Sequence, residues 1–201
     1  MINNHKKLYL ICVLLWLTSF LLYLPSLTFQ FINFDDHKIL LGNPHLYNNE
    51  SIIEGIREIF IKDFPREEPL LLRDITWAID SKIFGFRNPL GYHLGNVLLN
   101  AFNVVLLFLF LRSATKKVSI SLAITIIFAS LPVHVEPVCW IMGRKDLLMA
   151  FFSFICLLMQ AVEVETKKLF LRYCLNISIS FFYLLAILSK FSAVTGWILW
   201  F

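Results

Sequence analysis

Long runs of apolar residues alternate with short polar stretches along the chain. A helix that crosses the hydrocarbon core of a bilayer needs about 20 predominantly apolar residues. Such runs are found at Leu8–Leu27, Leu90–Leu111, Val118–Pro132, Leu147–Val162, Cys174–Leu188 and from Ala193 to Phe201. The pattern predicts an all-α, multi-spanning transmembrane helix bundle that forms one membrane domain over residues 1–201. Because the chain ends inside the sixth run, we expect it to be part of a longer protein.

The longest polar segment, residues 28–89, joins the first two runs. Gly42-Asn43-Pro44 predicts a turn. Ser51 and Glu54 form a capping-box pattern that predicts the start of an amphipathic helix. Residues Arg73–Phe84 carry isoleucines at a spacing of four and are followed by a glycine, which predicts a second short helix. The helix that begins at Ser51 could lie on the membrane surface or pack against the bundle.

Composition confirms the membrane class. Hydrophobic residues make up 58% of the chain, with 20 Phe against 7 Gly, and the mean hydropathy is +0.72. A soluble domain of this length could not bury so much apolar surface. The sequence therefore predicts an integral membrane protein.

Positive charge predicts the orientation of the helices. Lysine and arginine clusters fall on one side of the membrane if every run spans, and by the positive-inside rule this side is the cytoplasm. The clusters are Lys6, Lys7, Arg112, Lys116, Lys117, Lys167, Lys168 and Arg172. The N-terminus is then cytoplasmic, and residues 28–89, 132–146 and Lys190 face outward. The net positive charge of the chain is explained by this topology, because the basic residues gather on the cytoplasmic side. It therefore gives no reason to expect a nucleic-acid partner.

Asp35 and Asp36 lie just beyond the first apolar run. Adjacent carboxylates close to lipid are costly unless they have water, a partner or a function. A carboxylate within reach of a hydroxyl could take its proton in a transfer reaction. The pair could instead hold a divalent cation beside a phosphate. A solvated acidic loop is the third reading.

A second polar cluster runs from Pro132 to Asp146. Glu136 and Pro137 predict the cap and first residue of a helix that continues into the fourth span. This helix would bring Arg144 close to the water boundary, where its guanidinium group suits a phosphate. The alternative is interfacial snorkelling, with Arg144 balanced by Asp146.

A polar stripe marks the outer end of the second span, because His93, Asn96, Asn100 and Asn103 recur every three or four residues. We expect Asn100 and Asn103 to pack against other helices. His93 lies high enough to reach an outward cavity. Lys190 follows the fifth span and is either an interfacial anchor or part of the same site.

The four cysteines, Cys12, Cys139, Cys156 and Cys174, show neither metal-ligand spacing nor a CxxC motif. The sequence predicts no disulfide and no metal site built from them.

Five motifs together resemble the membrane O-mannosyltransferases that carry tetratricopeptide repeats, and their bacterial relatives. The motifs occur in the expected order between Phe31 and Thr195. They are Phe31-Ile-Asn-Phe-Asp-Asp36 with Asn43-Pro44, Arg73 through Asp80 to Phe84-Gly85, Pro89-x-Gly-Tyr-His-Leu-x-Asn96, Pro132-Val-His-Val-Glu136 to Gly143-Arg-Lys-Asp-Leu147, and Leu188-Ser-Lys190.

The resemblance implies a GT-C fold, here incomplete, with an active site on the lumenal or periplasmic side. It implies transfer of a mannose-type sugar from a polyprenyl- or dolichyl-phosphate donor to Ser or Thr hydroxyls of an acceptor protein. It makes Asp35 or Asp36 the catalytic carboxylate. Around the donor phosphate or the acceptor it places Arg73, His93, His134, Glu136, Arg144 and Lys190. We expect a bacterial inner membrane rather than the endoplasmic reticulum.

Four positions depart from the family pattern. Asp74 stands where proline is usual, Leu131 and Asn100 where histidine is frequent, and Phe191 where an acid commonly follows the lysine. These departures keep an alternative open, namely a non-catalytic or truncated membrane protein of the same fold that binds a lipid carrier or a partner subunit.

Overall fold

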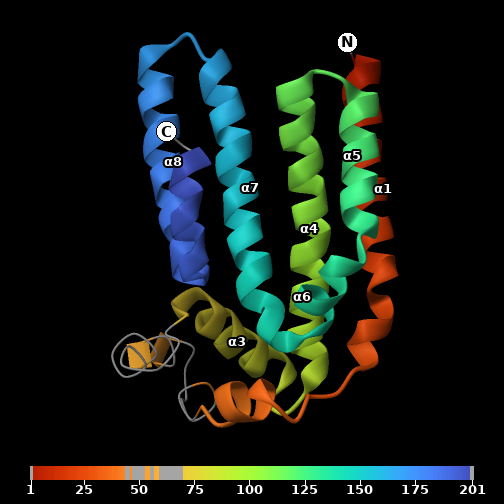
Figure 1. Ribbon diagram of the computed structural model, residues 1–201, viewed down its shortest axis with the longest axis vertical. Helices are drawn as coiled ribbons and strands as arrows, with labels where there is room; N and C mark the ends of the chain where they lie inside the picture. Colours follow the sequence, from red (N-terminus) through yellow and green to blue (C-terminus); the bar gives the residue numbers. More distant parts are fainter. Residues whose placement is uncertain (1, 44–45, 47–52, 55–56, 59–69, 200–201) are drawn as a thin grey trace.

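The computed structural model describes residues 2–43, 46, 53–54, 57–58 and 70–199. Within these ranges every regular element is helical and no strand forms. Five long helices make up the bundle in Figure 1: α1 (Ile2–Leu22), α4 (Pro89–Thr115), α5 (Val118–Ser130), α7 (Arg144–Glu165) and α8 (Leu169–Ser189).

The long helices have the length and composition of membrane spans. Four described stretches qualify by themselves, namely His5–Leu22, Pro89–Thr115, Ile141–Glu165 and Leu169–Ser189. A fifth span can be made of α5 and the segment Pro132–Cys139 that follows it after a bend of 56°. The prediction of an all-α, multi-spanning membrane bundle is therefore confirmed.

The first span ends earlier than expected. The apolar run continues to Leu27, but α1 ends at Leu22 and a short 3-10 helix, η1 (Leu24–Thr28), takes over. Pro25 explains the change, because proline lacks the amide hydrogen that an α-helix interior needs. The sixth run forms another 3-10 helix, η6 (Phe191–Leu199), which turns back beside α8.

The bundle is organised around α4, which contacts α1, α5 and α7, whereas α8 packs mainly on α7. Leu15, Val104 and Phe108 form an apolar cluster between α1 and α4. Asn100 Nδ2 donates to Ser19 Oγ at 3.1 Å, and Asn103 Nδ2 donates to the Leu147 carbonyl at 3.0 Å. The expectation that these asparagines pack against neighbouring helices is confirmed.

One end of the bundle carries the N-terminus and the two short turns that join α4 to α5 and α7 to α8 (Figure 1). Lys116 ends α4 in a left-handed conformation, with φ of 58°. Its ammonium group pairs with Glu165 at the end of α7, so an ion pair joins the two turns. The basic clusters that were expected to share a side do lie at this same end.

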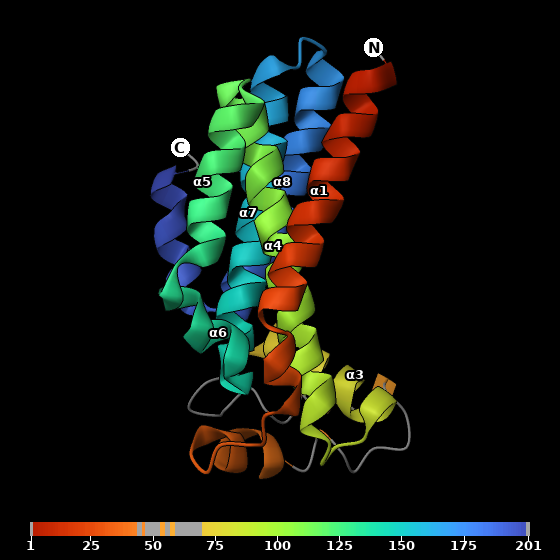
Figure 2. The same cartoon turned by 90° about the vertical axis from the view of Figure 1, so that its right-hand side faces the viewer.

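The opposite end, which we call the loop end, holds the short elements (Figures 1 and 2). They are η2 (Asp36–Leu41, a π-helix), α3 (Leu71–Phe84), η4 (Pro132–His134), α6 (Val135–Cys139) and η5 (Ile141–Gly143). The helix predicted over Arg73–Phe84 is confirmed as α3. The helix predicted from Ser51 falls largely on residues outside the described ranges.

The prediction of one continuous helix from Glu136 into the fourth span is wrong. The chain leaves the helical conformation at Trp140, with φ of −93° and ψ of 129°, and α7 begins only at Arg144. A β-carbon at Gly143 would lie 2.4 Å from the Pro137 carbonyl oxygen. The turn is thus so tight that only glycine fits there, and it re-aims Arg144 into the bundle.

Replacing Asn103 with alanine should lower the free energy of unfolding by about 1 kcal/mol, because a hydrogen bond between helices inside a membrane bundle contributes roughly this amount. Asn176→Ala is the matched control, since Asn176 is exposed on α8. Denaturant titration of the protein in detergent micelles measures both. Equal stability of the two variants would contradict the role of Asn103 as a tie between α4 and α7.

Candidate functional site

Arg144 is the buried centre of the loop end, with 2% of its surface exposed. Its Nη2 lies 2.8 Å from Asp80 Oδ2 and donates to the Tyr92 carbonyl at 2.6 Å. Its Nε donates to Asn96 Oδ1 at 2.5 Å. These four residues together with Trp140 are called the Arg144 corner below. The corner joins α3, the first turns of α4 and the start of α7.

This geometry corrects two expectations about Arg144. The guanidinium group does not lie at the water boundary, and its counter-ion is Asp80 rather than Asp146. A buried charge costs several kcal/mol unless it is paired and hydrogen-bonded, so α3 supplies the carboxylate and α4 the oxygen acceptors. Asp80 also offsets the unfavourable placement of a cation at a helix N-terminus.

Gly95 makes the approach of Arg144 to α4 sterically feasible. A β-carbon at this position would lie 2.4 Å from Nη2 and 2.8 Å from Cζ of Arg144. Any other residue would push the guanidinium group away from the Tyr92 carbonyl. In the sequence, the one feature that could have indicated this contact is the presence of a glycine, Gly95, inside an apolar span.

The segment Phe31–Leu41, called the aspartate loop below, is attached to the corner through Asp36. Asp36 is fully buried, and its Oδ2 accepts the Ile32 amide hydrogen at 2.9 Å. The Trp140 indole interacts with the carboxyl group, although neither Asp36 Oδ1 nor Trp140 Nε1 makes a hydrogen bond of normal geometry to a described residue. The Trp140 carbonyl in turn accepts a hydrogen bond from Asn96 Nδ2 at 2.8 Å. Hydrogen bonds therefore join Trp140 to Asn96 and Asn96 to Arg144, whereas Asp36 and the Trp140 indole are neighbours without one.

Apolar contacts hold the same loop in place. Leu40 of η2 is fully buried in a cluster with Trp77 of α3, Tyr92 of α4 and Met142 of η5. The Phe31 ring lies 5.9 Å from the Tyr92 ring, measured between centroids. Since burying a side chain of this size contributes about 1.5–3 kcal/mol, the cluster makes docking of the loop favourable.

The two adjacent aspartates have different surroundings. Burial raises the pKa of Asp36, and the Ile32 amide and the Trp140 indole oppose this shift. Asp35 is half-buried and precedes η2 without capping it through its side chain. Asp35 is thus the more accessible member of the pair, while Asp36 anchors the loop.

Arg73 forms a second buried charge pair in α3. Its Nε donates to Asp74 Oδ1 at 2.8 Å, and its guanidinium carbon lies 4.6 Å from the centre of the Trp77 ring. Both members of the pair are buried. Asp74 is one of the positions that departs from the family pattern, and here it supplies the counter-ion of Arg73.

His93 does not reach an open cavity as expected. It is 2% exposed, and its ring packs edge-on against Phe29 with centroids 6.2 Å apart. Neither ring nitrogen has a hydrogen-bond partner within the described part of the chain. His93 therefore belongs to the interior that supports the corner.

Three predicted site residues are more accessible. Lys190 follows α8, and its ammonium group pairs with Asp146 in the first turn of α7, with each side chain 34% exposed. Glu136 is exposed on α6. The His134 ring lies half-buried at the bend after α5, 4.2 Å from the Phe128 ring, and its Nε2 is enclosed without a hydrogen-bond partner among the described residues. The structure thus divides the predicted residues into a buried set and an accessible set.

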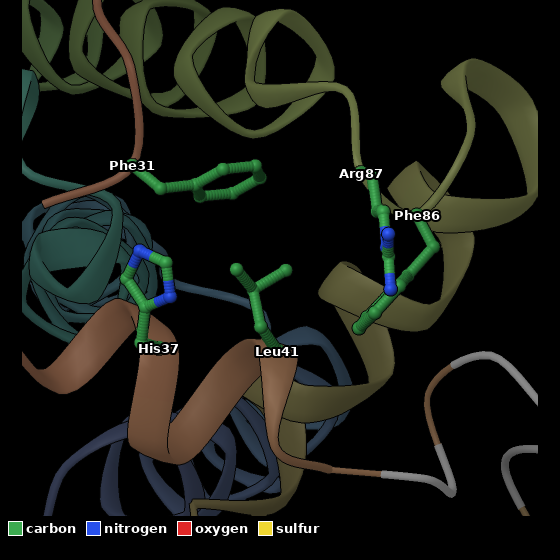
Figure 3. A pocket seen from close by; sticks show the side chains of 5 residues that line it. All are labelled: Phe31, His37, Leu41, Phe86 and Arg87. Carbon is green, nitrogen blue, oxygen red and sulfur yellow. The ribbon is translucent and has the colours of Figure 1, made fainter. Parts of the chain in front are cut away.

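A hollow of about 610 Å³ opens beside the aspartate loop. Phe31, His37 and Leu41 line it from the loop, and Phe86 and Arg87 line it from the turn between α3 and α4 (Figure 3). Sequence analysis did not single out His37 or Arg87. In the sequence, His37 directly follows Asp36 and Arg87 lies two positions after Gly85, and this proximity to predicted motifs could have indicated them.

No group of three or more His, Cys, Asp or Glu side chains is arranged to hold a metal ion in the described ranges. A divalent cation at Asp35 and Asp36 would have to use Asp35 and substrate oxygens, because Asp36 is enclosed.

Sequence comparison finds one similarity that covers most of the chain. The chain is 28% identical over 188 residues to "Protein O-mannosyl-transferase Tmtc1" of Drosophila melanogaster. The match includes 90% of this chain and 21% of that protein, so the chain spans about a fifth of its length. No family model matches the chain, and no solved structure matches it.

Gly95→Ala should destabilise the protein by about 2–4 kcal/mol, because it displaces a buried, paired guanidinium group. At an ordinary helix position the same change would stabilise by about 0.5–1 kcal/mol. The double variant Gly95→Ala with Arg144→Ala is the control, and in it the Gly95→Ala cost should disappear. A cost that persists without Arg144, measured by denaturant titration, would contradict the assigned contact.

Asp36→Asn should stabilise the protein at neutral pH. An unfolded aspartate has a pKa of about 3.9. Because the pKa of Asp36 is raised in the folded protein, folding retains a proton, and stability falls as the pH rises through this window. The advantage of Asp36→Asn should vanish in acid, where both forms are neutral. Unfolding curves from acid to neutral pH test this, with Asp35→Asn as the control; an advantage independent of pH would contradict it.

Proposed function

We propose that this chain is a membrane part of a glycosyltransferase related to the protein O-mannosyltransferases. In this proposal the loop end transfers a mannose-type sugar from a polyprenyl-phosphate carrier to Ser or Thr hydroxyls of an acceptor protein. The similarity to the Drosophila protein supports the assignment over nearly the whole chain. The five sequence motifs support it at the residues of the loop end.

The observation that carries the proposal is the docking of the aspartate loop on the Arg144 corner. Asp36 and Arg144 are more than a hundred positions apart, yet Trp140 and Asn96 connect them through consecutive contacts. A rigid support of this kind holds a catalytic group within a narrow range of positions, which transfer chemistry requires. A solvated acidic loop would not be attached in this way.

Asp35 is the proposed general base. Its carboxylate takes the proton of the acceptor hydroxyl while the hydroxyl oxygen bonds to the anomeric carbon of the sugar. The bond from that carbon to the carrier phosphate oxygen breaks, and the phosphate leaves with the electron pair. Asp36 cannot fill this role because its carboxyl group is enclosed, so it positions Asp35 instead.

Lys190 is the proposed cation for the departing phosphate. Among the predicted cations it stays about a third exposed, whereas Arg73 and Arg144 are buried at 1% and 2%. A cation placed where negative charge grows stabilises the transition state. Asp146 would hold the ammonium group until the donor arrives. His134 and Glu136 are proposed to border the acceptor, and the buried Arg73, His93 and Arg144 to support the site.

The basic clusters at the opposite end support a cytoplasmic N-terminus, which places the loop end on the far side of the membrane. A lipid-linked donor and the acceptor would then meet at the membrane surface on that side.

A second candidate function is carrier or partner binding without turnover. The observation that favours it is the neutralisation of Arg144, whose guanidinium group is occupied by Asp80, Asn96 and the Tyr92 carbonyl. A corner occupied in this way could serve as a purely structural support.

Membranes containing the protein can be supplied with labelled polyprenyl-phosphate mannose and an acceptor protein. Asp35→Asn should lower transfer by about 100-fold or more, as expected for loss of a general base. Lys190→Gln should lower transfer about tenfold, and Lys167→Gln at the opposite end should leave it unchanged. Equal transfer by parent and Asp35→Asn would remove the catalytic assignment. Donor binding without any transfer by the parent would favour the second candidate.

A further inference from the structure

We propose that the hollow between η2 and the α3–α4 turn binds an acidic segment of the acceptor polypeptide, next to the hydroxyl to be modified. This inference rests on the proposed function, which requires an acceptor protein. It adds a specificity for acidic sequence and assigns it to His37 and Arg87, outside the residues of the transfer site.

The chemistry of the hollow favours an anionic, partly apolar occupant. Phe31, Leu41 and Phe86 supply apolar walls, and the two polar side chains are the imidazole of His37 and the guanidinium of Arg87 (Figure 3). Among the residues that the structure describes, no acid lines the hollow. Arg87 is exposed and no described acid pairs with it, in contrast to Arg73 and Arg144. A planar guanidinium group binds a carboxylate through two parallel hydrogen bonds.

The position of the hollow favours a polypeptide over a lipid head group. Figures 1 and 2 both place η2 beyond the ends of the long helices, at the extremity of the loop end. An occupant therefore enters from water. A volume of about 610 Å³ accommodates several side chains of a peptide.

The hollow is close in sequence to the proposed base. His37 lines it and follows Asp35 by two positions, with the buried Asp36 fixing the backbone between them. A peptide held by Arg87 and His37 would thus present neighbouring residues to Asp35. Acidic residues close to the acceptor Ser or Thr are the expected recognition feature.

The test measures binding, without sugar transfer. Two labelled short peptides are compared by fluorescence anisotropy with the purified protein in detergent micelles, one with a threonine flanked by aspartates and one with it flanked by lysines. The parent should bind the acidic peptide about tenfold more tightly, and Arg87→Glu should reverse this order. Arg87→Lys should keep the preference for acid, because the positive charge is retained. Lys167→Glu is the matched charge reversal at the opposite end and should change nothing.

The relative affinity of Arg87→Glu for the acidic and the basic peptide decides the inference. If this variant binds both peptides as the parent does, or if Lys167→Glu shifts binding equally, the assignment of the hollow is overturned. Anionic lipid micelles can also be added as competitors of the acidic peptide. If they displace this peptide from Arg87→Glu as well as from the parent, the peptide binds at a site other than the hollow, and the inference is overturned. Transfer of sugar with no preference for acid would refute the inference and leave the proposed function standing. Binding of the acidic peptide that depends on Arg87, without any sugar transfer, would support the inference and contradict the proposed function.

Discussion

The guanidinium group of Arg144 fixes three segments that are distant in the sequence. Asp80 brings α3 to it, the Tyr92 carbonyl and Asn96 bring the start of α4, and Arg144 itself begins α7. A charge buried to this extent is stable only while its counter-ion and acceptors stay in place. The corner therefore fixes how these segments are placed relative to one another. A larger residue at Gly95 would displace the Arg144 guanidinium, and one at Gly143 would clash with the Pro137 carbonyl.

The loop end divides its polar residues between support and access. Arg73, His93, Arg144 and Asp36 are buried. Arg73 pairs with Asp74, Arg144 pairs with Asp80, and Asp36 accepts a hydrogen bond from the Ile32 amide. Asp35, Lys190, Glu136, His37 and Arg87 are at least partly accessible. Rigid buried groups that hold accessible ones are the arrangement expected for a site that must position a substrate precisely in space. This division supports the proposed roles of Asp35 as base and of Arg144 as a positioning residue.

Hydrophobic patterning predicted the helices well, because every backbone group of a spanning segment must be satisfied within its own helix. It also predicted that Asn100 and Asn103 tie helices together. It failed where local geometry depends on distant partners. The break at Trp140 follows from the packing of Gly143 on Pro137, and the pairing of Arg144 with Asp80 depends on the placement of α3. The periodicity of apolar and polar residues in the sequence does not predict either contact. The hollow beside His37 and Arg87 also arises only when two loops meet.

Photo-crosslinking in intact membranes can show whether the aspartate loop lies on the Arg144 corner. Benzoylphenylalanine replaces Phe31, whose ring lies 5.9 Å from that of Tyr92, and adducts are mapped by mass spectrometry after irradiation. We expect adducts on Tyr92 or on Met142 of the same apolar cluster. Adducts confined to lipid, or to the turn between α4 and α5 at the opposite end, would contradict it.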